Sequence, residues 1–330
     1  MFPIAFHPIY QHPLPEGHRF PMLKYELLPQ QLVHEGTAYV ADFFEPEMCD
    51  LAPVLAIHTT TYVNDLLQLT LDTKAARKIG FPLSKELVER ELIIAQGTIV
   101  GAQKSFDTKV SFNIAGGTHH AFTDHGEAFC LLNDQAIAAQ FLLNHKLAKK
   151  IVITDHGEAF CLLNDQAIAA QFLLNHKLAK KIVIIDLDVH QGNGTAEIFQ
   201  NNPNVFTFST HGKTNYPFKK ETSDLDIAFD DGTTDDAFLK TIGDIIPKLI
   251  ETQKPDFIFY LAGVDILTSD KLGKLSCSLE GCKKRDELVF ELCAKHQIPT
   301  QVSMGGGYSP NIKTIIEAHS NTYRVAKSIF

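Results

Sequence analysis

The segment IVIIDLDVHQGNG, residues 182–194, carries side chains of the kind that bind metal ions. Asp186, Asp188 and His190 are two residues apart, so an extended strand would point all three to the same side. Three such groups at the end of an apolar run are costly to bury unless a cation or hydrogen bonds satisfy them. An aspartate and a histidine from this segment, joined by a third carboxylate, would form a three-ligand site with an open position, as catalytic zinc requires.

The third carboxylate is expected at the end of another apolar run. Asp265 ends the segment FIFYLAGVD, which makes it the candidate. A calcium loop is a competing interpretation, because DLDVHQGNGTAE has acids at its first and third places and Glu197 at its twelfth. Its sixth place is Gln191 instead of glycine, however, and the preceding segment is β-branched instead of helical. Each aspartate alone could also cap a helix, but together with His190 they favour a metal site.

Two further motifs place polar side chains after strands. The segment AGGTHHAF contains the adjacent histidines His119 and His120, and MGGGYSP places Tyr308 after three glycines. Adjacent residues on a strand point apart, so both histidines can face one site only where the chain has left the strand. Glycines allow the backbone to approach a ligand closely. Either motif alone also fits an ordinary buried polar group.

The chain contains a perfect internal repeat, because residues 123–153 recur without a single change at 154–184. Solenoid repeats diverge and come in threes or more, so this pair indicates a recent duplication or an assembly error. Without one 31-residue copy the chain of 330 residues would have 299. The end of the first copy cannot form the metal site, because glycine and alanine stand where Asp188 and His190 follow the second. We therefore expect one copy to be extruded from the core.

Short apolar runs alternate with amphipathic segments along the rest of the chain. Most runs are apolar at consecutive positions, which is typical of parallel strands covered on both faces. The pattern predicts one three-layer α/β/α domain over residues 1–330 with a mainly parallel sheet, and with its site after the carboxyl ends of the strands. The last helix is expected to begin with Ser309 as N-cap and Pro310 at its first position. The expected strands are VLAIH (54–58), VSFNIAGG (110–117), IVIIDLDVH (182–190), VFTFST (205–210), FIFYLAGVD (257–265) and TQVSMGGG (300–307).

Composition limits the class of protein. The chain is 45% hydrophobic and 21% charged, so it can bury a sizeable core, and its net charge of −9 argues against nucleic-acid binding. The opening residues have no basic segment before an apolar one, and no apolar run approaches the roughly 20 residues that span a bilayer. The six cysteines form no CxxC and are expected to be reduced thiols. We expect a cytoplasmic protein, or a nuclear one if it is eukaryotic.

Five motifs in this order, GGTHHAF, GEAFCLLND, IDLDVHQGNG, LAGVD and GGGY, resemble the zinc-dependent histone deacetylase family. The resemblance runs from PEGHRFPMLKY near the start to the last helix, apart from the extra repeat copy. The glutamine and asparagine of HQGNG, with the downstream segment 270–290, look most like the class IV branch and its bacterial relatives. The resemblance implies an arginase/deacetylase-like fold.

It also implies roles for the motif residues. Zinc would be bound by Asp188, His190 and Asp265, and the pair His119 and His120 would match the catalytic dyad. A second set of roles concerns positioning and the substrate. Tyr308 would bind the substrate carbonyl, and Asn193 would be the partner of the second histidine. Asp186 would orient the first histidine. Asp186 and Ser209 would both contribute to a structural K⁺ or Na⁺ site.

The walls of the site are implied less directly. Arg19 matches an arginine of the inner cavity near the leaving acetate, and Phe129 or Phe160 would form the channel wall, depending on which repeat copy packs on the sheet. Gly306 would line the same channel. One departure matters: many members have aspartate where this chain has Asn193, which is the class IV pattern and supplies no charge to stabilise an imidazolium.

The implied activity is hydrolysis of acyl groups on lysine side chains, with an acyl-lysine protein or peptide as partner. An amidohydrolase acting on acetylpolyamines or other small acylated amines is the nearest alternative. A catalytically impaired module that binds acyl-lysine is another. A binuclear arginase-like site is disfavoured, because further carboxylates are not evident after these strands.

Overall fold

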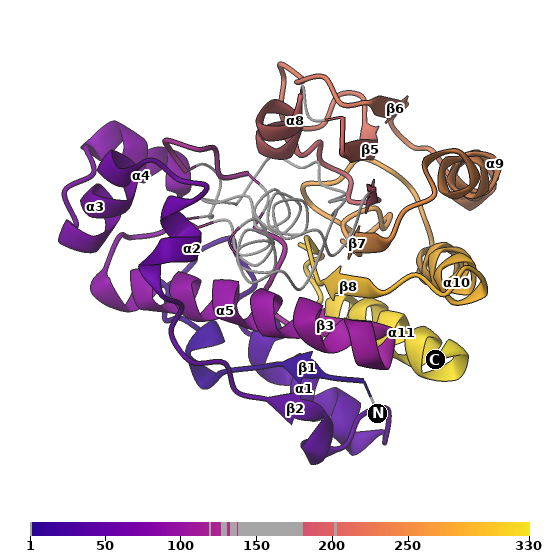
Figure 1. The fold of residues 1–330 in the computed structure, drawn as a ribbon, viewed down its shortest axis with the longest axis horizontal. Helices are drawn as coiled ribbons and strands as arrows, with labels where there is room; N and C mark the ends of the chain where they lie inside the picture. The colour runs from indigo at the N-terminus through magenta and orange to yellow at the C-terminus, as the bar shows by residue number, and fades with distance from the viewer. Residues whose placement is uncertain (1, 119, 127–130, 133–136, 138–180, 201–202) are drawn as a thin grey trace.

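The computed structural model describes residues 2–118, 120–126, 131–132, 137, 181–200 and 203–330 (Figure 1). Within these residues eight strands form one sheet in the order β2-β1-β3-β8-β7-β4-β5-β6, and every pairing is parallel. The strands are β1 (Ile4–Ala5), β2 (Phe43–Phe44), β3 (Val110–Asn113), β4 (Ile182–Asp186), β5 (Val205–Gly212), β6 (Leu225–Phe229), β7 (Phe257–Leu261) and β8 (Thr300–Ser303). The predicted parallel α/β domain is confirmed.

Helices cover both faces of this sheet. Two neighbouring residues of β3 show the two layers, because Asn113 donates from Nδ2 to Thr98 Oγ1 at 2.7 Å on one face, while the Phe112 ring stacks on Tyr323 at 4.3 Å on the other. Thr98 belongs to α5 and Tyr323 to α11, and α9, α10 and α11 line one side of the strands in Figure 1. The helices are η1 (Pro8–Tyr10), α1 (Lys24–His34), η2 (Val40–Asp42), α2 (Leu51–Leu55), α3 (Thr60–Gln68), α4 (Thr73–Ile79), α5 (Lys85–Thr108), α8 (Asn193–Phe199), α9 (Asp235–Gln253), α10 (Leu279–Lys295) and α11 (Ile312–Ile329).

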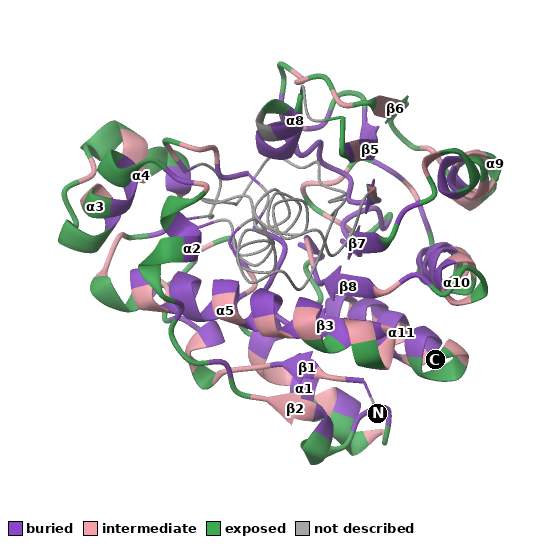
Figure 2. Ribbon diagram, in the orientation of Figure 1, coloured by how far each residue is buried: buried purple, intermediate pink, exposed green. Residues whose placement is uncertain are grey.

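The core lies between the sheet and these two helical layers. Every residue of β7 is buried, as expected for a strand that is covered on both faces (Figure 2). The helices are buried only where they face the sheet or each other, and their outer faces are exposed. None of the helices in the described residues is long and apolar enough to span a membrane.

The parallel register brings several chain segments to one edge. β4 lies between β7 and β5, so Asp186 at its end pairs with Leu261 on one side and Ser209 on the other. The carboxyl ends of β3, β8, β7 and β4 therefore meet at the same edge, where ligands bind in sheets of this kind.

Several sequence predictions about elements are wrong. Four expected strands, 110–117, 182–190, 257–265 and 300–307, each end four residues earlier, at Asn113, Asp186, Leu261 and Ser303. The run 54–58 is not a strand, because Val54 lies in helix α2 and the His58 N–H donates to its carbonyl oxygen at 2.9 Å. A five-residue apolar run does not distinguish a strand from a buried helical turn. The last helix begins two residues later than predicted, since Asn311 caps it by accepting from the Lys313 N–H, while the Ser309 hydroxyl is hydrogen-bonded to Ser269.

Candidate metal centre and its surroundings

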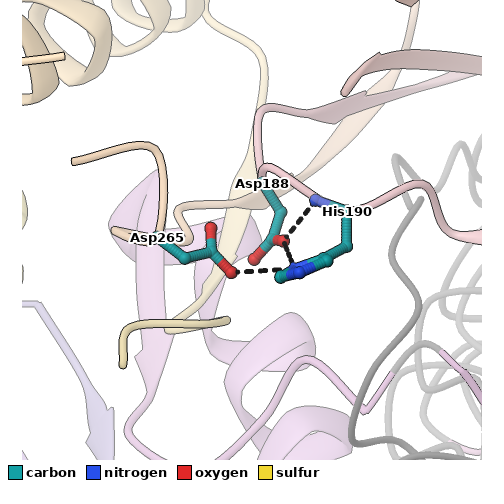
Figure 3. A group of neighbouring side chains, drawn as sticks. All are labelled: Asp188, His190 and Asp265. Atoms are coloured by element: carbon teal, nitrogen blue, oxygen red, sulfur yellow. Dashed lines mark hydrogen bonds and ion pairs between the residues drawn. The ribbon is translucent and has the colours of Figure 1, made fainter. Parts of the chain in front are cut away.

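The structure brings the three predicted ligands together in the interior (Figure 3). One ligand atom from each of Asp188, His190 and Asp265 lies within 4.8 Å of the other two, and all three residues are buried. His190 Nδ1 is 3.3 Å from Asp188 Oδ1 and 3.2 Å from Asp265 Oδ2, so the ring nitrogen faces both carboxylates (Figure 3). A buried nitrogen and two carboxylates around one point could hold a divalent metal ion.

The side chains converge by a different route from the one predicted. β4 ends at Asp186, so Asp188 and His190 lie beyond the strand and its alternation no longer applies. Instead, Asp186 Oδ1 accepts from the Asp188 N–H at 2.7 Å, and Asp188 Oδ1 accepts from the His190 N–H at 3.0 Å. Aspartate side chains that bond the backbone two residues on form a turn of their own. This pair of turns directs Asp188 and His190 toward Asp265.

Backbone N–H groups from other loops hold the two carboxylates in place. Asp188 Oδ2 accepts from the Gly306 N–H at 3.0 Å, and Asp265 Oδ1 accepts from the Val189 N–H at 3.1 Å. These hydrogen bonds connect the loops after β4, β7 and β8. Such outer partners fix the orientation of metal ligands and are needed for tight binding.

Two glycines leave room at the centre, Gly306 for the carboxylates and Gly305 for the backbone of Gly263. A Cβ atom on Gly306 would lie 2.0 Å from Asp265 Oδ2 and 2.9 Å from Asp188 Oδ2, so any side chain there would displace both. Gly305 has φ of +70° and packs against Gly263, where a Cβ would meet backbone atoms at 2.9 Å. The glycine run after β8 is therefore required by the geometry of the metal centre.

The electrostatics of the centre favour added positive charge. Burial raises the pKa of Asp265 above its ordinary value, and the negative charge of the neighbouring Asp188 adds to this shift. For His190, burial acts to lower the pKa, but hydrogen bonds to Asp188 and Asp265 outweigh it and raise the pKa. Both shifts mean that the cluster binds a proton more readily than the separate groups would. A bound cation would meet the same demand for positive charge.

Arg285 holds two of the loops that form the centre, and this role was not predicted from the sequence. This fully buried residue of α10 forms an ion pair with Asp286, with 2.9 Å between Arg285 Nε and Asp286 Oδ1. Its Nη1 also donates to the carbonyl oxygens of Leu187 and Gly263. Leu187 directly precedes one ligand, and Gly263 lies two residues before another, so Arg285 connects the two loops that carry them. Nothing in the amphipathic pattern of this helix distinguishes Arg285 from a solvated charge.

Tyr308 lies beside the centre in a fixed position. Its ring centroid is 6.5 Å from that of His190, and its N–H donates to Asp270 Oδ2 at 2.6 Å. Asp270 Oδ1 accepts in turn from the N–H groups of Leu272 and Gly273. Burial raises the pKa of Tyr308 well above its usual range, and the nearby Asp265 acts in the same direction. The hydroxyl is therefore a neutral hydrogen-bond donor. The anchoring role of Asp270 was not predicted, although an aspartate three residues before a glycine is a turn signal.

Lys24 is a buried cation next to Tyr308 that sequence reasoning also missed. Its Nζ donates to the Gly305 carbonyl at 3.1 Å and lies 5.7 Å from the centroid of the Tyr308 ring. Burial lowers the pKa of Lys24 to about 8, although the carboxylates of the centre, led by Asp265, act in the opposite direction. Buried lysines with shifted pKa values are enriched at functional sites.

The remaining predicted catalytic residues are placed less completely. His120 and Asn193 are both buried, and Asn193 is the first residue of α8. The loop that leads to His120 packs against the glycine run, since a Cβ on Gly117 would lie 3.3 Å from the Gly305 nitrogen. Ser209 is paired with Asp186 in the sheet register and is hydrogen-bonded to His211 Nδ1 at 2.9 Å. The predicted His119, Phe129 and Phe160, and most of both repeat copies, lie outside the described residues.

Arg19 lies on the exposed side of the site. Its side chain lines an open cavity of about 370 Å³ that also contains His190. Arg19 belongs to a loop before α1, whereas Lys24, five residues on, is in the first turn of α1 and is buried at the centre. The predicted contact of Arg19 with the leaving acetate stays a prediction.

Comparison with known proteins agrees with this arrangement. Residues 18–157 and again 154–323 match the histone deacetylase domain, so the matches extend over most of the chain. The chain belongs to the histone deacetylase family. A protein of Picosynechococcus sp. is 39% identical to it over 329 residues, covering 100% of this chain and 99% of the relative. Histone deacetylase 2 of Arabidopsis thaliana is 26% identical over 310 residues, covering 91% and 72%.

Solved structures of the family share the fold. An HDAC homologue from Aquifex aeolicus matches with a TM-score of 0.76 at 20% identity, over 98% of this chain and 83% of that one. An HDAC homologue complexed with SAHA also matches with a TM-score of 0.76, at 19% identity, over 100% and 84%. This histone deacetylase family member is thus a hydrolase with a single parallel-sheet domain.

The two matches to the histone deacetylase domain meet within the internal repeat. The first ends at residue 157 and the second begins at 154, which is the first residue of the second copy.

Proposed function

We propose that the protein is a zinc-dependent amidohydrolase that removes acetyl or longer acyl groups from lysine side chains. The observation that carries the proposal is the buried cluster of Asp188, His190 and Asp265 in a chain of this family. One imidazole nitrogen and two carboxylates form a donor set that zinc accepts, and three protein ligands leave a position for substrate or water. Backbone N–H groups already orient both carboxylates, so the donor set fits the metal.

Zinc, when bound, supplies a Lewis acid that polarises the acyl carbonyl and activates the attacking water. Tyr308 donates a hydrogen bond from its hydroxyl to the acyl oxygen, because its raised pKa keeps the hydroxyl protonated at neutral pH. His120 takes a proton from the water as the new C–O bond forms, and it returns a proton to the amine as the C–N bond breaks. We assign His119 to the same dyad from the resemblance.

The supporting roles are proposed on the same basis. Asp186 and Ser209 are neighbours in the sheet register, which supports a structural K⁺ or Na⁺ ion there. Asn193 supports a class IV-like member, in which an amide orients His120 without stabilising its imidazolium form. The basicity of His120 should then be lower than beside a carboxylate.

The experiment that tests the function compares three substrates on the zinc-loaded protein. They are an acetyl-lysine peptide, a long-chain acyl-lysine peptide and an N-acetylated diamine. We expect kcat/KM for the better peptide to exceed that for the diamine by about tenfold or more, because the cations around the site repel the free ammonium of the diamine. A preference for the diamine would indicate a small-molecule amidohydrolase. No turnover of any substrate with zinc bound would indicate a binding module.

We further propose that the extra copy of the repeat contributes nothing to catalysis and that one copy is extruded. Because the copies are identical, deletion of either gives the same 299-residue chain. Closing a flexible loop of about 31 residues costs roughly 3 kcal/mol of chain entropy, so the deletion should raise Tm by about 5 °C or more. We expect kcat/KM to stay within about twofold, since the ligand loops lie outside the deletion.

The deletion is checked by thermal unfolding and by kcat/KM at equal zinc content of the two proteins. A 299-residue chain that fails to fold, or that loses activity while it keeps its zinc, would contradict the proposal.

A further inference from the structure

The cavity that contains His190 has a basic rim. Of its described lining residues four are cationic, Arg19, Arg77, Lys78 and Lys274, and none carries a carboxylate. All four side chains are exposed, whereas His190 at the inner end is buried. The chain as a whole has a net charge of −9, so this concentration of positive charge runs against its composition. We call these four residues the basic rim.

Contacts between two separate segments hold one part of the rim together. Arg77 and Lys78 lie in the last turn of α4, and His18, next to Arg19, places its Nε2 3.0 Å from the Gly80 carbonyl oxygen just after that helix. The His18 ring also stacks on Phe81 at 5.7 Å. The segment that carries Arg19 is thereby fixed beside the end of α4.

Other residues that line the cavity combine a cation with an exposed aromatic ring. Lys274 Nζ donates to Thr214 Oγ1 at 2.7 Å and lies 3.9 Å from Asp231, so its charge is partly shared. Phe218 is 89% exposed, and its ring lies edge-on to that of Tyr216 at 6.0 Å. A fully exposed phenylalanine beside an active-site cavity offers an apolar contact for a peptide.

We infer that the basic rim selects peptides in which aspartate or glutamate flanks the acyl-lysine; this inference rests on the proposed function. The acyl group must reach the buried cluster at His190, so the residues on either side of the lysine stay at the mouth, beside the four cations. Charges at an exposed rim act mainly on association and on the choice of partner, and salt screens them. Acidic flanks are therefore favoured, and basic flanks are repelled.

The test uses acetyl-lysine peptides of one length whose flanking residues are glutamate, glutamine or lysine. At low salt, about 0.02 M, we expect kcat/KM for the glutamate peptide to exceed that for the lysine peptide by about tenfold or more, and the ratio to approach one at about 0.5 M salt. The double variant Arg77→Gln with Lys78→Gln should reduce the ratio of kcat/KM between the glutamate and lysine peptides. The double variant Arg77→Glu with Lys78→Glu should reverse it. Lys295→Glu, at an exposed position in the last turn of α10 and outside the lining, is the control and should leave the ratio unchanged.

Each outcome separates this inference from the function on which it rests. Equal turnover of the three peptides at low salt, or a preference that the Arg77 and Lys78 variants do not alter, would overturn the basic-rim inference and leave the deacylase function standing. No turnover of any peptide would overturn the function and the inference with it. A succinyl-lysine peptide with glutamine flanks tests the other source of negative charge. If it alone gains rate over its acetyl counterpart, the anion recognised is in the acyl group and the assignment to the flanks is wrong.

Discussion

Replacing His190 by alanine is expected to remove both the bound zinc and the deacylase activity. The imidazole Nδ1 faces Asp188 and Asp265 at 3.2 to 3.3 Å, so the variant loses one of three ligands. Changes to the outer partners of metal ligands already cost 10- to 100-fold in affinity, so loss of a ligand should cost more than about 100-fold. kcat/KM should fall by about 1,000-fold or more, since the lost Lewis acid outweighs a single hydrogen-bond donor. Metal analysis and kinetics on the purified variant measure both quantities.

Matched variants separate the metal centre from general stability. Gly306→Ala keeps all three ligands but should also lose zinc affinity, because its Cβ would lie 2.0 Å from Asp265 Oδ2. Gly243→Ala, inside α9 with nothing within 4 Å of the added atom, should keep zinc and activity. His296→Ala, at an exposed position, controls for loss of a histidine. A His190→Ala protein that retains one zinc per chain together with activity would contradict the assignment.

The meeting of the three candidate ligands could be predicted from the sequence because the evidence for it is local. An apolar run that ends in DLDVH, and another that ends in Asp265, are each visible within ten residues. The two segments then come together because the carboxyl ends of parallel strands lie at the same edge of the sheet. The contacts confirm this meeting of the loops, although the turns built by Asp186 and Asp188, not strand alternation, direct the side chains.

The supporting residues could not be predicted because their function depends on long-range contacts. Lys24 reaches the Gly305 carbonyl 281 positions away, and Arg285 reaches the Leu187 carbonyl 98 positions away. In the sequence Lys24 is an isolated charge and Arg285 lies in the charged run KKRDE, and charges of either kind are usually solvated. Their burial follows from contacts with the carbonyl groups of the loops after β4, β7 and β8. The two-residue strands β1 and β2 were missed for a related reason, since so short a segment has no periodicity of its own.

The basic rim indicates substrate selection although its residues form no sequence motif. Arg19 is exposed and lines the same cavity as Arg77 and Lys78. Lys24, by contrast, is buried. The outer and inner cations therefore act at different points: the rim meets the substrate before it enters, and Lys24 lies behind Tyr308 at the centre.

Tyr308→Phe is expected to lower kcat by about 100- to 1,000-fold, the usual cost of one donor to a developing oxyanion, while zinc content stays unchanged. The ring should keep its position, because the Tyr308 N–H donates to Asp270 and the Lys24 ammonium lies over the ring, 5.7 Å from its centroid. KM should change less than kcat, since the hydrogen bond strengthens as charge develops on the acyl oxygen. Steady-state kinetics on an acyl-lysine peptide, with metal analysis, measure these effects.

Tyr323→Phe provides the matched control for loss of a buried tyrosine hydroxyl. Tyr323 stacks on Phe112 at 4.3 Å in the α11 layer, so its change should leave kcat unaltered. The pH profile adds a second criterion. Because burial raises the pKa of Tyr308 well above its ordinary value, the hydroxyl stays protonated through neutral pH, and the phenylalanine variant should keep the shape of the profile at a lower rate. An unchanged kcat in Tyr308→Phe would rule out the oxyanion role, and loss of zinc would show that the tyrosine acts on the metal centre instead.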